Sequence, residues 1–295
     1  MISNSAKNRL LICFSWTSAL VLATGFACIL GFLFVQGLPA FKAGLIFGDS
    51  PVLDALLLKR QVFGGLFPAM VGTVFLVILS MVMALPLGLS TGIWLSEYAP
   101  PGLKGGLSFI MDILAGIPSI VVGLFGFSIT IFLHHYYNGR IFPCLLISAV
   151  SLAFLVLPYI VKTTQGALES LPLPVRLTAL SLGASKLENI IYVLLPSALS
   201  DIISGIILAV GRCAEDTAVI MLTGVVATAG IPKSLFSNFE ALPFYIYYIA
   251  SEYADHSELI KGYGAALILL LICTGLFMLA HGIKYWIDGK VRFRP

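Results

Sequence analysis

Long apolar stretches separated by short polar segments run along most of this chain. Six of the stretches are long enough for a helix to cross a hydrocarbon core about 30 Å thick. They lie at residues 10–35, 67–96, 107–133, 141–161, 197–227 and 263–287. The pattern predicts an all-α polytopic membrane protein with six transmembrane helices. It divides the chain into an N-terminal helix with its external loop (1–66), a main transmembrane domain (67–287) and a C-terminal tail (288–295).

Composition and charge agree with this class and add an orientation. Of the 295 residues, 59% are hydrophobic and 11% are charged, whereas soluble domains average about 25% charged residues. With the N-terminus inside, the inner segments hold ten Lys and Arg residues and the outer segments hold six. By the positive-inside rule, both termini are predicted to be cytoplasmic. The net charge of +3 is scattered over loops and ends, so no nucleic-acid partner is expected.

Several kinds of site are not indicated by the sequence. All five cysteines lie in apolar segments, which is typical of small buried hydrophobic residues rather than of a disulfide or metal framework. We therefore expect no metal site and no cofactor bound by this chain. The ATP-binding motif G-x-x-x-x-G-K-[ST] is absent, and the four histidines suggest no catalytic set. The chain is not expected to be an enzyme.

A charged cluster interrupts the fifth apolar stretch. Arg212, Glu215 and Asp216 stand at helical spacing i, i+3 and i+4, which predicts that all three project from one face. A charge at the bilayer centre costs about 2.5–3.5 kcal/mol, so this face is expected to line a protein interior or a water-filled path. The cluster therefore predicts a transporter.

The planar guanidinium of Arg212 matches a tetrahedral oxyanion and stays charged at any relevant pH. Two functional accounts of the acids are open: they neutralise Arg212 when no substrate is bound, or one accepts the proton of hydrogen phosphate. The structural alternative is an internal ion pair that braces two helices. Ser119 and Thr217 offer hydroxyls to an oxyanion, although a hydroxyl bonded back to its own helix is the commoner arrangement.

The longest inner loop, about residues 162–196, has the pattern of two short amphipathic helices. We expect a turn between them at Gly183 and an end to the second helix at Pro196. A loop of this length predicts a docking surface, and the alternative is an interfacial helix pair lying on lipid headgroups. Earlier in the chain, Gly116, Pro118 and Gly123 are expected to kink a membrane helix and allow close packing, with a role in a gate as the alternative.

The inner loop resembles a known family. Gly183, Val193 and Leu195-Pro196 match the loop signature of permease subunits of ATP-binding-cassette (ABC) importers. Further stretches are similar to the phosphate-specific transport permeases of the PstA/PstC type. These stretches are 65–73, 84–88, 94–100, 114–126, 157–164, Gly211-Arg212 and Thr217-Ala218. Their common order over about residues 64–225 makes the resemblance specific.

The resemblance implies a type I (MetI-like) ABC importer fold and a permease that translocates inorganic phosphate. Residues 67–287 would form the permease domain, and residues 163–196 would form the ATPase-coupling loop. Along the substrate path we expect Arg212, Glu215, Asp216 and Thr217, with a gate or kink at Gly116, Pro118, Ser119 and Gly123. In the coupling loop it implies Leu177, Thr178, Ala179, Gly183, Ala184, Ser185, Leu195 and Pro196.

The family also implies the partners and the location. The partners would be a second homologous permease, two copies of a cytoplasmic ATPase that hold the ATP, an external phosphate-binding protein and membrane lipid. The chain would be integral to the cytoplasmic (inner) membrane of a bacterium or archaeon.

The chain departs from the family pattern at two places. The loop signature normally opens with Glu-Ala-Ala, where this chain has Leu177-Thr178-Ala179. The fifth span normally carries Gly-Arg-x-x-Gly-Glu-Thr, where this chain has Glu215 for the second glycine and Asp216 for the glutamate. Alternatives therefore remain: the same architecture for molybdate, tungstate or a phosphonate, a proton-coupled secondary transporter, or a non-transporting membrane scaffold or sensor.

Overall fold

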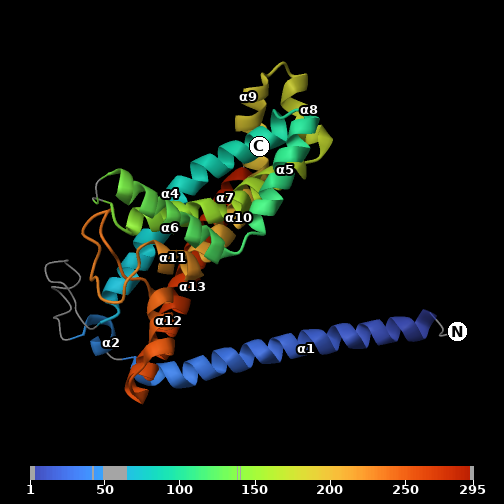
Figure 1. Cartoon of the computed structure of the whole chain (residues 1–295). Helices are drawn as coiled ribbons and strands as arrows, with labels where there is room; N and C mark the ends of the chain where they lie inside the picture. The colour runs from blue at the N-terminus through green and yellow to red at the C-terminus, as the bar shows by residue number, and fades with distance from the viewer. Residues whose placement is uncertain (1–3, 42, 49–64, 138, 140, 293–295) are drawn as a thin grey trace.

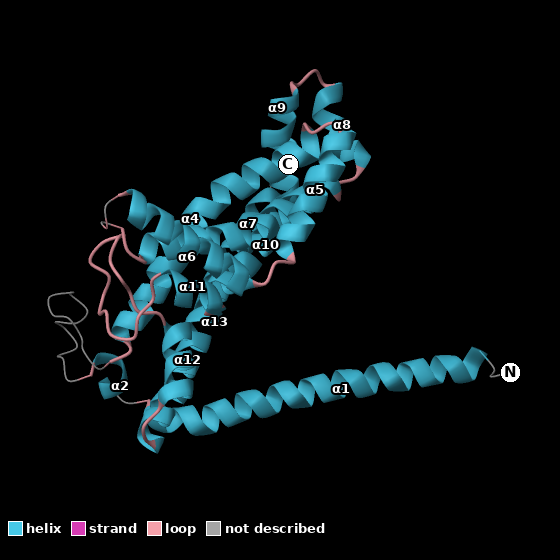
Figure 2. Ribbon diagram, viewed as in Figure 1, coloured by secondary structure: helices cyan, strands magenta, loops and turns pink. Residues whose placement is uncertain are grey.

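The computed structural model describes residues 4–41, 43–48, 65–137, 139 and 141–292. Within these ranges the chain consists of helices and loops, and the only β-type pairing is an isolated bridge between Val225 and Phe239 (Figure 2). The elements in chain order are α1 (Asn4–Gly37), η1 (Leu38–Ala40), α2 (Ala43–Phe47), α4 (Phe67–Glu97), α5 (Pro101–Ala115), α6 (Ser119–Tyr136), α7 (Leu145–Glu169), α8 (Leu173–Ser181), α9 (Lys186–Asn189), the π-helical turn η2 (Ile190–Leu194), α10 (Leu195–Glu215), α11 (Ala218–Thr223), α12 (Leu242–Glu252) and α13 (His256–Arg292).

Six helices in the described part are long and apolar enough to cross a membrane, which confirms the predicted number. The third predicted span, 107–133, is wrong as a single helix because the chain breaks between α5 and α6. Proline lacks an N–H and disfavours the helical conformation in the residue before it. Pro118 therefore ends one helix, and Ser119 begins the next.

The fifth predicted span, 197–227, is also broken. Helix α10 ends at Glu215, and Asp216 is extended with φ −73° and ψ 115°. The shorter helix α11 follows from Ala218 to Thr223. The side chain of Asp216 favours this break, because its carboxylate accepts a hydrogen bond from the backbone N–H of Val219 in α11.

The ends of the chain differ in part from the predicted boundaries. Helix α13 begins at His256 and continues to Arg292, so the first residues of the predicted tail 288–295 are helical. Residues 293–295 of that tail lie outside the described residues. So do residues 49–64, which form much of the external loop predicted within 1–66.

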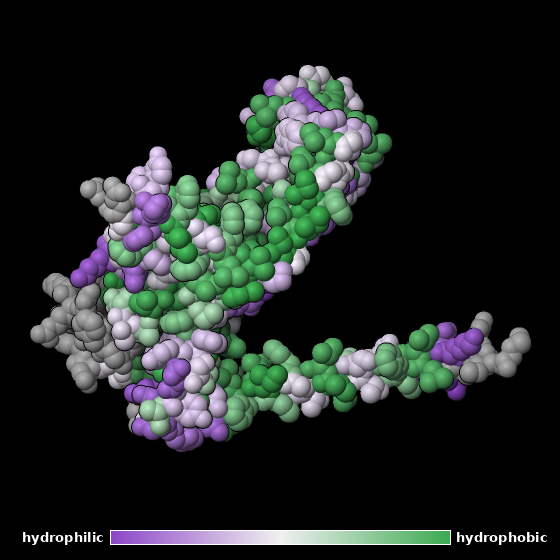
Figure 3. Space-filling model, in the orientation of Figure 1, coloured by the Kyte–Doolittle hydropathy of each residue, from purple (hydrophilic) through white to green (hydrophobic). Residues whose placement is uncertain are grey.

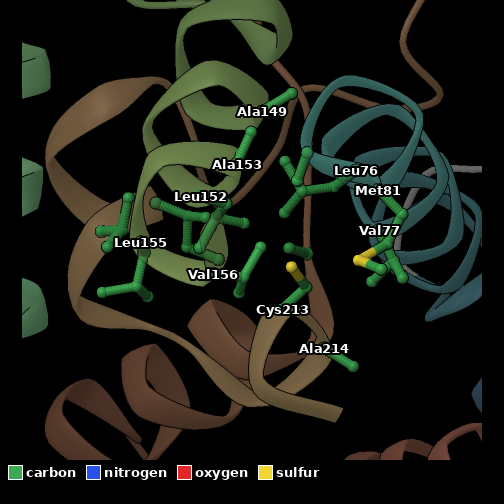
Figure 4. Packing of buried hydrophobic residues seen from close by; sticks show 14 of the residues in the cluster. Leu76, Val77, Met81, Ala149, Leu152, Ala153, Leu155, Val156, Cys213 and Ala214 are labelled. Carbon is green, nitrogen blue, oxygen red and sulfur yellow. The ribbon is translucent and has the colours of Figure 1, made fainter. Parts of the chain in front are cut away.

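Helix α7 lies at the centre of the bundle, and small residues let its neighbours approach closely. A Cβ atom on Gly88 of α4 would lie 2.6 Å from the side chain of Ile160 in α7. A Cβ atom on Gly92 would lie 2.7 Å from the side chain of Thr164. Backbones can approach this closely only where side chains are absent, as in the small-xxx-small pattern of membrane helices. Figure 4 shows another part of this core, with Leu152 and Val156 of α7 among side chains from α4 and α10.

Helices α10 and α13 run antiparallel. Gly211 abuts Phe277, and the Nζ of Lys284 donates to the Oγ of Ser204 at 2.7 Å. This pairing brings the C-terminal end of α13 to the end of the bundle that carries α8 and α9 (Figure 1). Polar residues gather at the two ends of the bundle, whereas its flanks are apolar (Figure 3).

Helix α1 projects away from the bundle and touches it only near its own C-terminal end (Figure 1). Phe32 forms an edge-to-face contact with Tyr263, with ring centroids 5.6 Å apart. The preceding apolar side chains of α1 are exposed, which is expected of a helix whose neighbours are lipid or another subunit.

The end of the bundle opposite α8 and α9 is closed by the loop 224–241. The N–H groups of Cys144, Leu145 and Leu146, at the start of α7, donate to the carbonyls of Thr223, Ser237 and Leu235. The free N–H groups that every helix start leaves are thus satisfied by backbone from a distant loop. At the same end, the Oγ1 of Thr73 in α4 accepts a hydrogen bond from the N–H of Leu242 at 2.9 Å.

Candidate functional site

Arg212 lies in the last turn of α10, just before the break. Its Nη1 is 3.6 Å from the Oε1 of Glu215, one turn along the same helix, and the two side chains are 40% and 64% exposed in the isolated chain. At 3.6 Å the pair is electrostatic contact rather than a well-formed hydrogen bond. The buried Nε of Arg212 has no hydrogen-bond partner among the described residues. The guanidinium therefore has donors that a ligand could use.

The predicted alternative of a brace between two helices does not describe this pair, because both residues stand on α10. The prediction that three charges share one helical face is wrong for Asp216. This side chain is buried, and its Oδ1 accepts a hydrogen bond from the N–H of Val219 at 2.9 Å. An unsatisfied N–H in the membrane interior would cost several kcal/mol, roughly, so Asp216 stabilises the start of α11. The exposed part of the cluster is one cation with one anion.

The break between α5 and α6 has its own side-chain partner. The hydroxyl of Tyr159 in α7 donates to the carbonyl of Ala115, the last residue of α5, at 2.9 Å. Both breaks therefore have a backbone group satisfied by a side chain, which is how a broken helix persists within a membrane protein.

The two breaks are neighbours because α6 packs on α11. A Cβ atom on Gly123 would lie 3.0 Å from the carbonyl oxygen of Ala218, so this glycine is explained by close packing. Gly116 has no such contact: its closest neighbour would be 3.4 Å away. Pro118 and Ser119 form the break itself, and a gate at this break stays a prediction.

Two hydroxyls expected near an oxyanion path stand beside the breaks. Ser119 is the first residue of α6, and Thr217 links α10 to α11. Both side chains are half-buried. In the part of the chain that the structure describes, neither hydroxyl is bonded back to its own helix. They remain available as hydrogen-bond donors.

The inner loop forms a helical hairpin, α8 and α9, as its pattern predicted. Gly183 turns the chain with φ +87°, a conformation that favours glycine, and no atom lies close enough to require glycine for space. Ser185 caps α9 in a reciprocal arrangement with Glu188. The sequence Ser-x-x-Glu carries that signal, which our sequence analysis missed.

The hairpin, which projects from one end of the bundle (Figure 1), exposes apolar side chains, with Leu182 85% exposed. The other exposed members of this apolar surface are Leu173, Leu177, Leu180, Leu187, Ile191 and Tyr192. Thr178 and Ser185 are exposed beside them, whereas Ala179 and Ala184 are half-buried. A surface of this kind on a membrane protein is typical of a site that another molecule covers.

The predicted end of the second helix at Pro196 is wrong. The chain passes from α9 through η2 into α10 without a break, and Pro196 lies in the first turn of α10. The N–H of Leu195 reaches back five residues to the carbonyl of Ile190. Such a π-helical turn accommodates the proline, which would otherwise clash with the carbonyl four residues earlier. One helical segment therefore joins Lys186 to Glu215.

A second Arg–Glu pair fastens this hairpin to the bundle. The Nη2 of Arg176 in α8 lies 2.5 Å from the Oε1 of Glu97, the last residue of α4, and the Glu97 side chain is only 8% exposed. Arg176 also donates through Nη1 to the carbonyl of Leu168 at 2.9 Å. The sequence gives no local signal of this pairing, because the two residues stand 79 positions apart.

Other ion pairs at the same end join α5 to α7. Lys162 contacts Asp112 at 2.9 Å, and Lys104 contacts Glu169 at 2.7 Å. These side chains are about one-third or more exposed, so their effect on stability is small. Among the described residues, no group of three His, Cys, Asp or Glu side chains is placed to hold a metal ion.

A buried acid marks the opposite end of the bundle. Glu240 is 8% exposed and accepts a hydrogen bond from the N–H of Gly230 at 2.7 Å. Burial raises the pKa of its carboxyl above the usual value, and the hydrogen bonds from Gly230 and Ala229 oppose that rise. Glu240 thus holds the loop 224–241 in place, but it lies far along the chain from the helix breaks.

Comparison with known proteins supports the same picture. The sequence model of the family described as "binding-protein-dependent transport system inner membrane component" matches residues 84–293. The phosphate transport system permease protein PstA 1 of Mycobacterium tuberculosis (strain H37Rv) is 31% identical over 231 residues, which covers 78% of this chain and 72% of that protein. The PstA protein of Haemophilus influenzae is 28% identical over 272 residues and 92% of each chain.

Two solved structures show the fold. A bacterial ABC transporter involved in the import of the acidic polysaccharide alginate has a TM-score of 0.60 at 16% identity, covering 95% of this chain and 99% of that chain. The MetNI methionine ABC transporter in an inward-facing conformation has a TM-score of 0.58 at 17% identity, covering 75% and 97%. The predicted type I (MetI-like) importer permease fold is confirmed.

Proposed function

The chain belongs to the family of binding-protein-dependent transport system inner membrane components, and from this membership we propose that it is the permease subunit of an ATP-driven importer of inorganic phosphate. The relatives named as phosphate permeases, which align with up to 92% of this chain, support phosphate as the ion. The role is transport: the chain moves the ion, and the partner ATPase holds and hydrolyses the ATP.

The observation that carries the proposal is the state of Arg212. It is a permanent cation in the last turn of a membrane helix, half-exposed and only loosely paired. Its guanidinium can donate two parallel hydrogen bonds to a tetrahedral oxyanion. A membrane protein retains such a group where it contacts a charged solute. Ser119 and Thr217 supply hydroxyls near the same pair of helix breaks.

The two acids have separate roles in this proposal. Glu215 neutralises Arg212 when no ion is present and moves aside when an oxyanion arrives, which the 3.6 Å separation and the exposure of Glu215 permit. From its displaced position the carboxylate of Glu215 can also accept a hydrogen bond from the protonated oxygen of hydrogen phosphate. Asp216 acts through structure, because its carboxylate caps α11.

The hairpin of α8 and α9 is the proposed docking surface for the ATPase. Where the family signature has an acid, this chain exposes Leu177. The ATPase surface that receives the hairpin is therefore expected to be apolar at this position. Because one helical segment joins Lys186 to Glu215, a displacement of the hairpin also displaces the turn that carries Arg212.

The remaining partners follow from the architecture. A second permease, homologous or identical, would complete the pore and cover the exposed apolar flanks of the bundle. An external phosphate-binding protein would deliver the ion at the end formed by the loop 224–241 and α12, and both termini would be cytoplasmic. A solved relative of similar fold is a bacterial alginate ABC transporter in complex with a periplasmic protein.

Uptake of labelled phosphate into vesicles that contain the whole complex tests this function. We expect ATP-dependent uptake that vanadate stops and an uncoupler leaves intact, with competition by arsenate but not by sulfate. Uptake that survives vanadate and collapses with the uncoupler would instead identify a proton-coupled transporter. Uptake of molybdate, tungstate or a phosphonate in preference to phosphate would keep the importer and change its ion.

A further inference from the structure

Arg176 contacts two helices of the bundle and the other arm of its own hairpin. Its guanidinium pairs with the carboxylate of Glu97 at the end of α4 and donates to the carbonyl of Leu168 at the end of α7. Its own carbonyl accepts a hydrogen bond from the Nδ2 of Asn189 in α9 at 2.9 Å. A planar guanidinium can serve two acceptors at once in a fixed geometry, which an ammonium group cannot do equally well.

The second arm of the hairpin holds the same turn of α4. The Nζ of Lys186, at the start of α9, donates to the backbone carbonyl of Glu97. The same Nζ lies 4.7 Å from the centroid of the Tyr98 ring, in a cation–π contact. Both arms of the hairpin therefore contact the end of α4, the first through Arg176 and the second through Lys186.

Helix α4 cannot move independently of the core. Gly88 and Gly92 bring its backbone against Ile160 and Thr164 of α7, with no space even for an added methyl group. Helix α7 in turn contacts α10 closely at Gly205, where a Cβ would lie 2.3 Å from the Oγ1 of Thr163. Contacts without voids transmit displacement from one helix to the next.

We propose that the Arg176–Glu97 ion pair is the joint that transmits movement of the α8–α9 hairpin to α4. Arg176 and Glu97 are then positioning residues for transport, and the hairpin has two connections to the core: the continuous helix into α10 and this joint to α4. The inference rests on the proposed function, because it assumes that an ATPase moves the hairpin. The competing explanation is a brace that only keeps the hairpin folded.

The test uses vesicles that contain the whole complex. It measures phosphate uptake, ATP hydrolysis and the amount of assembled complex in the same vesicles. The variants are R176M, which removes the guanidinium, R176K, which keeps its charge, and E97Q, which keeps the shape of the side chain. The matched control is K162M, which breaks another ion pair at the same end of the bundle that does not involve the hairpin.

With the joint lost, hydrolysis continues while less of the movement of the hairpin reaches α4, because only the contact of Lys186 and the helix into α10 remain. We expect phosphate imported per ATP hydrolysed to fall about tenfold in R176M, and by less in R176K and E97Q. K162M should keep the wild-type ratio. A double exchange, R176E with E97R, should recover part of the ratio if both single exchanges fold.

Two results would overturn the joint. One is a wild-type ratio in assembled R176M and E97Q complexes. The other is a parallel loss of uptake, hydrolysis and assembled complex at a constant ratio, which is the behaviour of a simple brace. A wild-type complex that imports no phosphate would overturn the proposed function itself and this inference with it, so the two failures are distinguishable.

Discussion

The chain contains two Arg–Glu pairs of opposite construction. Arg176 and Glu97 come from different helices, approach to 2.5 Å and leave the acid 8% exposed. Arg212 and Glu215 come from one turn of one helix, stay 3.6 Å apart and leave the acid 64% exposed. The first arginine donates to two protein acceptors, whereas the buried Nε of the second has no partner among the described residues.

The contrast separates two uses of the same chemistry. A tight pair between helices fixes distance, and desolvation makes the loss of one partner costly. A loose pair within a helix contributes little to stability and exchanges readily for another anion. The tight pair therefore suits the connection between hairpin and bundle, and the loose pair suits the proposed path of the ion.

The largest effect is expected at the loose pair. R212M removes two charge-assisted hydrogen bonds to the ion, each about 1.5 kcal/mol, so uptake should fall about 100-fold. R212K keeps the charge without the planar fork, so its uptake should fall less than that of R212M. Initial rates of labelled phosphate uptake measure both variants. Normal uptake in R212K with unchanged affinity would argue for a structural role of Arg212.

The tight pair should dominate stability instead. E97A leaves the guanidinium of Arg176 without its partner in a mostly buried place, at a cost of about 2 kcal/mol, below the range of about 3–5 kcal/mol for fully buried pairs. In a chain of this size that lowers the melting temperature by about 4–8 °C. Thermal unfolding of the purified protein in detergent measures the shift.

The matched variant at the loose pair is E215A. Its expected cost is below about 1 kcal/mol, as for exposed ion pairs. An equal loss of stability in E97A and E215A would remove the distinction between the two pairs.

The smallest effect concerns the buried acid Glu240. Burial raises the pKa of Glu240 in the folded protein. At a pH between the usual carboxyl pKa and this raised pKa, the folded state therefore binds more protons than the unfolded state. Stability should therefore decrease as the pH rises from that range to the raised pKa of the folded protein, and E240Q should flatten this dependence. Melting temperatures between pH 4 and pH 7 test it. A wild-type stability that rises over that interval, with E240Q unchanged from it, would contradict the assignment.

Local features of the sequence predicted what depends on local forces. The six membrane helices follow from runs of apolar residues, and the turn at Gly183 follows from the freedom of glycine at positive φ. The break at Pro118 was open to the same reasoning, because proline disrupts a helix locally, but the continuous apolar run favoured one span. The predicted common face of the three charges holds for Arg212 and Glu215 and is wrong for Asp216.

The rest depended on contacts that no local pattern contains. Whether α10 continues past Glu215 is decided by competition between a helical backbone bond and the bond from Asp216 to Val219. Tyr159 finds the end of α5 through packing, 44 residues away in the chain. The joint between Arg176 and Glu97 spans 79 residues. Such pairs become visible only when the helices are packed.

The loop that satisfies the first N–H groups of α7 has a consequence for biosynthesis. Their carbonyl partners at Thr223, Leu235 and Ser237 are synthesised about 80 to 90 residues after the groups they receive. While the ribosome extends the chain, water must solvate the start of α7, so this helix enters the membrane with its first turn incomplete. The hydrogen bonds that complete the first turn of the central helix therefore form only after the chain has been extended through Ser237, so insertion of α7 and its final packing are separate steps of assembly.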